Sequence, residues 1–131
     1  MQTLALSFPC EPEELSRVRH QLHDWLEAVN VPAEQRPGIV IGTHEAAANA
    51  VRHAQPCETF QLRAEIQPTA LTIEIVDQGH WAGYSTDHLR THDAFEEHGR
   101  GLDLIQQLFG HVEIRTSQQG TTIQMRQPIV L

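Results

Sequence analysis

The chain has 131 residues, with 9 basic side chains against 17 acidic ones and a formal net charge of −8. This acidic balance argues against a nucleic-acid-binding protein. All nine basic residues are arginine, and the absence of lysine excludes both a Walker-A phosphate loop and a Schiff-base lysine enzyme. The length predicts a single domain over residues 1–131, large enough to bury a normal core.

The cysteines and the hydrophobic pattern bear on the compartment. Cys10 and Cys57 fit neither a C-x-x-C motif nor the spacing of a metal site, so a reducing compartment is our expectation. No apolar run approaches the length of a membrane span, and residues 1–10 lack the basic start of a signal peptide. We therefore expect a cytoplasmic protein that does not act in a membrane.

The first half of the chain predicts one strand and two helices. Residues 2–8 alternate between apolar and polar side chains, which is typical of a strand, and Pro9 ends it. The acidic run 11–14 then opens a helix whose apolar residues follow at helical spacing as far as Asn30. Residues 38–54, GIVIGTHEAAANAVRHA, are rich in alanine and predict the second helix.

The second half predicts two hairpins around a third helix. Residues 59–66 and 71–76 alternate and form the first hairpin, and a polar stretch without clear periodicity follows at about 80–98. A helix at 102–109 comes next. It is followed by a second hairpin, whose strands cover 111–116 and 121–126. This element order predicts an α+β two-layer sandwich over a mostly antiparallel sheet.

The alanine-rich helix carries two polar side chains on one face. Glu45 and Asn49 are four residues apart, so they lie one turn apart on the same side. Gly38 and Gly42 flank this face, and we interpret them as room for a molecule close to the backbone. From the helix alone, a solvated polar stripe and a functional pair both stay open.

Three further motifs are weak individually. Asp77 follows a strand and precedes Gly79, so its carboxylate can accept an amino hydrogen of a purine, although D-x-G is also a common turn signal. The G-R-G run at 99–101 can present N–H groups to an anion, or can be a plain helix entry. Thr121, after Gly120, can offer a hydroxyl to a ligand or can simply close a hairpin.

In this order, E-x-x-x-N, D-x-G, G-x-G-L-x-L-I and G-T-T-I resemble the motifs of the GHKL (Bergerat-fold) ATP-binding domain. Within that superfamily the chain is most similar to the RsbW/SpoIIAB group of anti-sigma factor serine kinases. The resemblance covers nearly the whole chain. It implies a sandwich with the helices on one face of the sheet.

The resemblance also implies roles for the nucleotide-site residues. Glu45 would be the general base that takes the proton of an attacking serine hydroxyl, and Asn49 would hold Mg²⁺ at the phosphates of ATP. Asp77 would bind the adenine amino group, with Gly79 beside the ring and Thr121 assisting through water.

A second set of residues would contact the phosphates. By the same resemblance, Gly99, Arg100, Gly101 and Leu102 would close over ATP. The cofactors implied are therefore ATP and Mg²⁺.

The function implied is an ATP-dependent serine-protein kinase that is also an anti-sigma factor of a bacterial partner-switching system. Its partners would be a STAS-type anti-anti-sigma protein, which it phosphorylates, and a sigma factor, and it would act as a homodimer. Two alternatives stay open: a non-catalytic anti-sigma binding module with weak or no ATP binding, and a switch kinase acting on a STAS scaffold. Trp81, at the place of the second glycine of the family's D-x-G-x-G motif, and Glu97, before the G-R-G run, favour the non-catalytic module.

Overall fold

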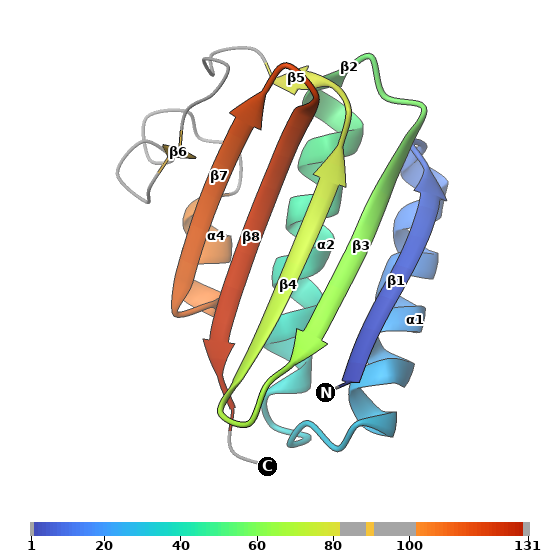
Figure 1. Ribbon diagram of the computed structural model, residues 1–131. Coiled ribbons are helices and arrows are strands. Elements are labelled where there is room, and N and C mark those ends of the chain that lie inside the picture. Colours follow the sequence, from blue (N-terminus) through green and yellow to red (C-terminus); the bar gives the residue numbers. More distant parts are fainter. Residues whose placement is uncertain (1, 82–88, 91–101, 130–131) are drawn as a thin grey trace.

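The computed structural model describes residues 2–81, 89–90 and 102–129 (Figure 1). Its elements in chain order are β1 (Gln2–Pro9), the 3-10 helix η1 (Pro12–Glu14), α1 (Leu15–Ala28), α2 (Arg36–His53), β2 (Ala54–Gln55), β3 (Thr59–Ile66), β4 (Ala70–Asp77), β5 (His80–Trp81), β6 (Leu89–Arg90), α4 (Leu102–Leu108), β7 (His111–Ser117) and β8 (Gly120–Pro128). None of the described helices is long and apolar enough to cross a membrane.

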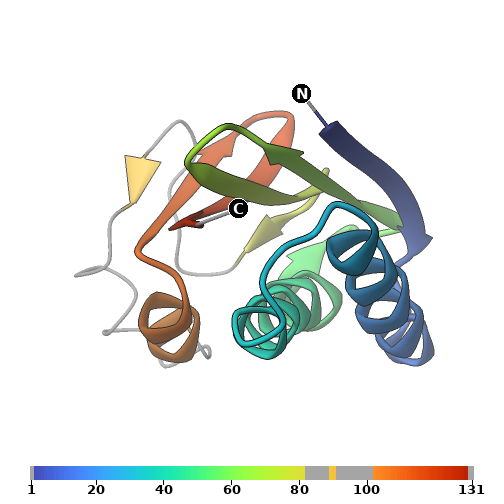
Figure 2. The ribbon, with the colours of Figure 1, turned by 90° about the horizontal axis from the view of Figure 1, so that it is seen from below.

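The strands form one main sheet with the order β1-β3-β4-β8-β7-β6, and all of its neighbours are antiparallel. β2 and β5 pair separately. Figure 2 shows α1, α2 and α4 together on one face of the sheet. The predicted α+β two-layer sandwich is therefore confirmed. None of the described helices lies on the other face of the sheet, which we call the helix-free face.

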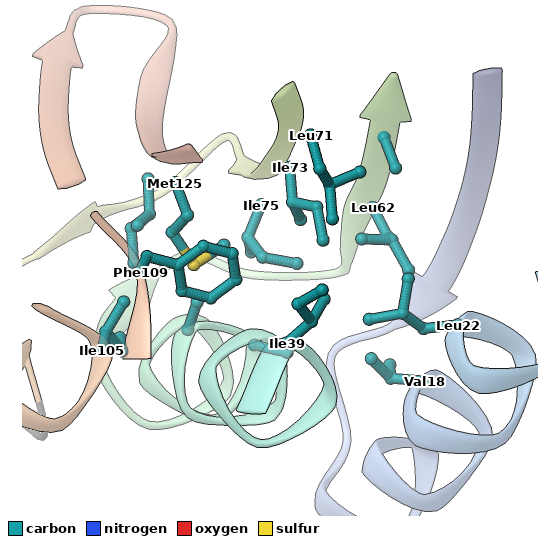
Figure 3. Packing of buried hydrophobic residues seen from close by; sticks show 14 of the residues in the cluster. Val18, Leu22, Ile39, Leu62, Leu71, Ile73, Ile75, Ile105, Phe109 and Met125 are labelled. Atoms are coloured by element: carbon teal, nitrogen blue, oxygen red, sulfur yellow. The ribbon is translucent and has the colours of Figure 1, made fainter. Parts of the chain in front are cut away.

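The core lies between the sheet and the helix layer. Alternate residues of β3, β4, β7 and β8 point inward, as the burial patterns of these strands show. Figure 3 shows the meeting of strand and helix side chains: Val18, Leu22, Ile39, Leu62, Leu71, Ile73, Ile75, Ile105, Phe109 and Met125. Burial of each such side chain is worth roughly 1.5–3 kcal/mol, so this layer holds α2 against the strands.

Cys10 and Cys57 form a disulfide, with their Cα atoms 5.8 Å apart. This corrects the expectation of a reduced pair. The cause is the register of the sheet: Pro9 pairs with Thr59 across β1 and β3, which brings the residues just beyond the two strand ends together. The backbone N–H of Cys10 also donates to the carbonyl of Glu58 at 2.9 Å.

Two details of the helices and strands differ from the sequence predictions. α2 begins at Arg36 because Pro37 occupies its first turn, where a missing N–H costs nothing. The stretch from about 80 to 98 contains two short strands, His80–Trp81 and Leu89–Arg90, and its other residues lie outside the described part. Two-residue strands have no periodicity, so alternation could not predict them.

Candidate functional site

α2 holds Glu45 and Asn49 in different environments. Its inward face is made of small side chains, including the fully buried Ala46 and Ala50, so the helix lies close to the sheet. Asn49 is buried as well, with an exposed fraction of 0%. Glu45, one turn earlier, is only half-buried. One polar group therefore faces the interior while its neighbour remains accessible to a partner.

The amide of Asn49 is the most unusual group in the described part of the chain. Neither its Nδ2 nor its Oδ1 has a hydrogen-bond partner among the described residues, although both atoms are buried. A buried polar group left in this way costs about 1–3 kcal/mol. Such a group needs an explanation, and a ligand that contacts the amide would supply it.

Asp77, Gly79 and Thr121 meet at the end of β4. The Asp77 carboxylate, 3% exposed, accepts the backbone N–H of Gly79 through Oδ1 at 2.9 Å. The Thr121 hydroxyl donates to the Gly79 carbonyl at 3.2 Å, and Thr121 stands opposite Asp77 in the β4–β8 ladder. Residues from two separate sequence motifs are thus joined in one cluster.

Two glycines make this cluster possible by their lack of a side chain. A Cβ on Gly79 would lie 2.5 Å from both the Gln55 nitrogen and the Pro56 carbonyl oxygen. Gly120 has φ +140°, and a Cβ there would lie 2.7 Å from the Cα of Gln78. The role of Gly120 was not predicted from the sequence, although its position directly before Thr121 was the available signal.

α2 and the Asp77 segment are connected through a short ladder. β2 follows α2 directly, and its Ala54 and Gln55 pair with Trp81 and His80 of β5. Figure 1 shows the end of α2, the end of β4 and the β7–β8 turn at the same end of the molecule. Trp81, which stands where the family motif has its second glycine, is therefore a strand residue.

Gly38 and Gly42 do not open a space for a ligand, contrary to our interpretation of the sequence. A Cβ on Gly38 would lie 3.5 Å from Leu108, whereas one on Gly42 would lie 2.9 Å from Cδ2 of the Phe109 ring and would overlap its Cε2. Gly42 instead lets Phe109, the residue after α4, pack closely on α2, whereas a Cβ on Gly38 would make only an ordinary contact with Leu108. The physical reason is that two helices approach most closely where one of them lacks side chains.

His44 and Arg19 form a polar contact between α2 and α1. Nη1 of Arg19 lies 2.9 Å from Nδ1 of His44, so the guanidinium donates to the unprotonated ring nitrogen. Burial and the Arg19 charge lower the pKa of His44, and Arg52 acts in the same direction, while Glu45 opposes them. This contact could not be predicted from the sequence, because no motif links the residues of α1 with those of α2.

The remaining predicted site residues cannot be tested in the same way. Gly99, Arg100 and Gly101 lie outside the described residues. Leu102 is the first residue of α4, and nothing is described of its side chain. The assignment of these four residues to the ATP phosphates stays a prediction.

Comparison with known families decides which class of protein carries this site. Residues 8–127 match the family model described as the histidine kinase-like ATPase domain. The chain belongs to this family. Membership confirms the predicted GHKL resemblance, and this type of domain implies ATP binding. A search of curated proteins finds no match.

Solved structures support the same fold. The RsbU and RsbW domains of Rv1364c from Mycobacterium tuberculosis superpose with a TM-score of 0.76 at 18% identity, covering 98% of this chain and 33% of that one. The Erythrobacter litoralis EL346 blue-light activated histidine kinase gives 0.62 at 18% identity, covering 93% and 42%. This histidine kinase-like domain therefore spans less than half the length of either solved chain.

Proposed function

We propose that this histidine kinase-like domain is an ATP-dependent serine-protein kinase that is also an anti-sigma factor of a partner-switching system. The observation that carries the proposal is the buried amide of Asn49, which has no partner among the described residues, one turn from the accessible carboxylate of Glu45. Within this family such a pair suits one group that binds the nucleotide and one that meets a protein substrate.

The proposed reaction transfers the γ-phosphoryl group of ATP to a serine. Glu45 accepts the proton of the serine hydroxyl while the serine oxygen bonds to the γ-phosphorus, and the bond from that phosphorus to the ADP oxygen breaks. Glu45 and Asn49 are separated by about 6 Å along the helix. That separation is short enough for both residues to act at one phosphate group.

The nucleotide would be held by the cluster at the end of β4. Asp77 would accept a hydrogen bond from the adenine amino group, and Gly79 and Thr121 would lie beside the ring. The hydrogen bonds among these three residues would hold them in place for the base. Asn49 would hold Mg²⁺ through Oδ1, and an oxygen ligand of this kind fits an ion that keeps several waters. When bound, the ion would neutralise charge on the phosphates.

The proposed partners follow from the family group. They are a STAS-type anti-anti-sigma protein, whose serine receives the phosphoryl group, and a sigma factor, and the active form is a homodimer. The proposed compartment is the cytoplasm, where thiols are kept reduced, so the Cys10–Cys57 disulfide speaks against it. Acid quenching of cells, followed by thiol alkylation at neutral pH in denaturant, tests this: alkylated cysteines support the cytoplasm, and an intact disulfide contradicts it.

Transfer of labelled phosphate from ATP to a panel of STAS-domain proteins tests the kinase proposal. Glu45→Ala should lower the transfer rate by roughly 10²–10⁴, the usual value of a general base, while Mg·ATP affinity changes little. Glu65→Ala, on β3 at the helix-free face, is the control and should leave the rate unchanged. Equal rates for wild type and Glu45→Ala would show that Glu45 is not the base.

A non-catalytic anti-sigma module is the second candidate. The observation in its favour is Trp81, whose backbone pairs with Ala54 at the place of a family glycine. This alternative predicts that wild type binds its sigma factor or STAS partner without phosphorylating it. Calorimetry with millimolar Mg·ATP separates the two, because a catalytic domain must bind nucleotide and the module need not.

A further inference from the structure

Two large apolar side chains are exposed on the helix layer. Ile41 on α2 is 47% exposed and Leu104 on α4 is 38% exposed, and the other large apolar side chains that the structure describes are buried or partly buried. Exposed apolar residues that lie together beside a functional group indicate an interaction surface. Ile41 precedes Glu45 by four residues, so it lies one turn away on the same face of α2.

Leu104 belongs to the same region of the surface. It is one turn from Leu108, whose side chain would contact a Cβ on Gly38 at 3.5 Å and on Gly42 at 3.6 Å. α2 and α4 pack directly on each other. Leu104 therefore flanks the part of α2 that carries Ile41.

A hollow lies on the other side of Ile41, between α1 and α2. Its volume is about 380 Å³, and it is lined by His23, Ala33, Arg36, Pro37, Val40 and Ile41. Most of this lining is apolar, so an aliphatic side chain entering the hollow would be removed from water. We call Ile41, Leu104 and this hollow the Ile41 surface.

The ionisable side chains around the Ile41 surface are mainly carboxylates, and the cations nearby on α1 and α2 are Arg19, which contacts His44, and Arg36. Asp24, with an 83% exposed side chain, follows His23 directly, and Glu34 is exposed beside Ala33. Arg36 lines the hollow, but its guanidinium donates to the Val31 carbonyl at 2.8 Å and lies 3.7 Å from Glu27. Its positive charge is thus already compensated. A partner with arginine or lysine beside an aliphatic side chain complements this surface.

Asp103, next to Leu104, and Glu45 itself extend the negative charge to the other end of the surface. A second copy of the chain is a poor occupant. It carries the same net charge of −8 and would bring the same carboxylates against these. The charge pattern therefore selects a different protein.

We propose that the Ile41 surface is the docking site for the protein substrate, whose serine receives the phosphoryl group beside the general base Glu45. The docking segment carries an aliphatic side chain and at least one arginine or lysine. These lie about 6–12 Å from the target serine, because Ile41 is one helical turn and Pro37 two turns from Glu45. This proposal rests on the proposed kinase function and names which part of the domain selects the protein substrate.

The test measures phosphate transfer and binding with the same panel of STAS-domain proteins. The variants are Ile41→Glu and Leu104→Glu, two exposed positions that the fold can accept. Ala5→Glu adds the same charge at an exposed position of β1 on the helix-free face and is the matched control. Each variant is also titrated with Mg·ATP.

The expected result is a KM for the protein substrate that rises roughly 10–100-fold in both surface variants, the effect of losing one buried aliphatic contact. The Kd for Mg·ATP and the kcat at saturating protein stay at wild-type values, and Ala5→Glu behaves as wild type. An unchanged KM in both surface variants overturns the docking proposal and leaves the kinase intact.

A different pattern identifies failure of the proposed function. If wild type binds a panel protein but transfers no phosphate, the kinase proposal is wrong. The docking proposal is then judged by Kd alone: weaker binding of Ile41→Glu than of Ala5→Glu supports it, and equal binding overturns it. If wild type neither binds nor phosphorylates any panel protein, both proposals are wrong.

Discussion

Replacing Asn49 with leucine should stabilise the nucleotide-free protein while it removes Mg·ATP binding. The two side chains share one heavy-atom skeleton, so the substitution exchanges the amide oxygen and nitrogen for methyl groups. Both amide atoms are buried and have no partner in the described part of the chain. The substitution therefore removes a desolvation cost without breaking any hydrogen bond of the described residues.

The expected gain is about 1–3 kcal/mol in the free energy of unfolding. For a chain of 131 residues, the entropy of unfolding converts 1 kcal/mol into about 3–4 °C, so Tm should rise by roughly 4–11 °C. Mg·ATP at a hundred times its Kd should stabilise wild type by about 2.7 kcal/mol and the variant not at all. The difference in Tm between the variant and wild type should therefore become smaller, or change sign, when nucleotide is added.

Thermal unfolding with and without Mg·ATP measures both effects. Thr43→Val is the matched control, because Thr43 is equally buried on α2 but donates to the Ile39 carbonyl at 2.8 Å, so its loss should bring no gain. Asn49→Ala checks for overpacking by the larger methyl groups. A lower Tm for both Asn49 variants without nucleotide, or wild-type ATP affinity in Asn49→Leu, would refute the reasoning.

Three other predictions concern the scaffold around the site. Cys57→Ser should lower the free energy of unfolding by about 4 kcal/mol under oxidising conditions, because the disulfide joins cysteines 47 positions apart. Chemical denaturation with and without reductant measures this difference, and wild type in reductant should have the stability of the variant. Gly42→Ala should cost about 1–3 kcal/mol through overlap with Phe109, whereas Gly38→Ala, which has room, should gain about 0.5–1 kcal/mol; chemical denaturation of both distinguishes tight packing from flexibility. The pKa of His44 is lowered in the folded state, so the unfolded chain binds more protons once the pH falls below the ordinary histidine pKa of about 6.5. The free energy of unfolding should therefore decrease as the pH falls through that value. Urea titrations between pH 7 and 5 should show a smaller decrease for His44→Gln than for wild type.

Periodicity in the sequence was enough to predict the architecture. The predicted strand 59–66 has the same bounds as β3, and the other long strands differ by one or two residues at their ends. The reason is that one face of each strand is buried on the helices, which leaves alternation in the sequence. The disulfide could not be predicted, because Cys10 and Cys57 meet through the pairing of Pro9 with Thr59, and strand register is not readable from cysteine spacing.

The sequence indicated which residues to consider together as a candidate site, and their role in binding the nucleotide stays a prediction; it did not indicate their environment. Asp77, Gly79 and Thr121 were expected to act together, and their hydrogen bonds agree with that expectation. The sequence could not reveal that Asn49 is fully buried, since burial depends on the sheet that covers α2. The glycines of α2 misled the interpretation, because a glycine looks the same whether a ligand or a neighbouring ring fills the space above it.

The pairing of β4 with β8 also determines where this domain can be attached to something else. Ala70 pairs with Pro128 and Asp77 pairs with Thr121, so the last strand ends about 23 Å from the nucleotide cluster, seven residues along a strand. Gln2 pairs with Ile66 at that same distant end, and Figure 1 shows both termini there. An affinity tag, a surface linker or a fluorescent fusion at either terminus would therefore leave Asp77 and Asn49 uncovered, and immobilised protein can be used for the titrations above.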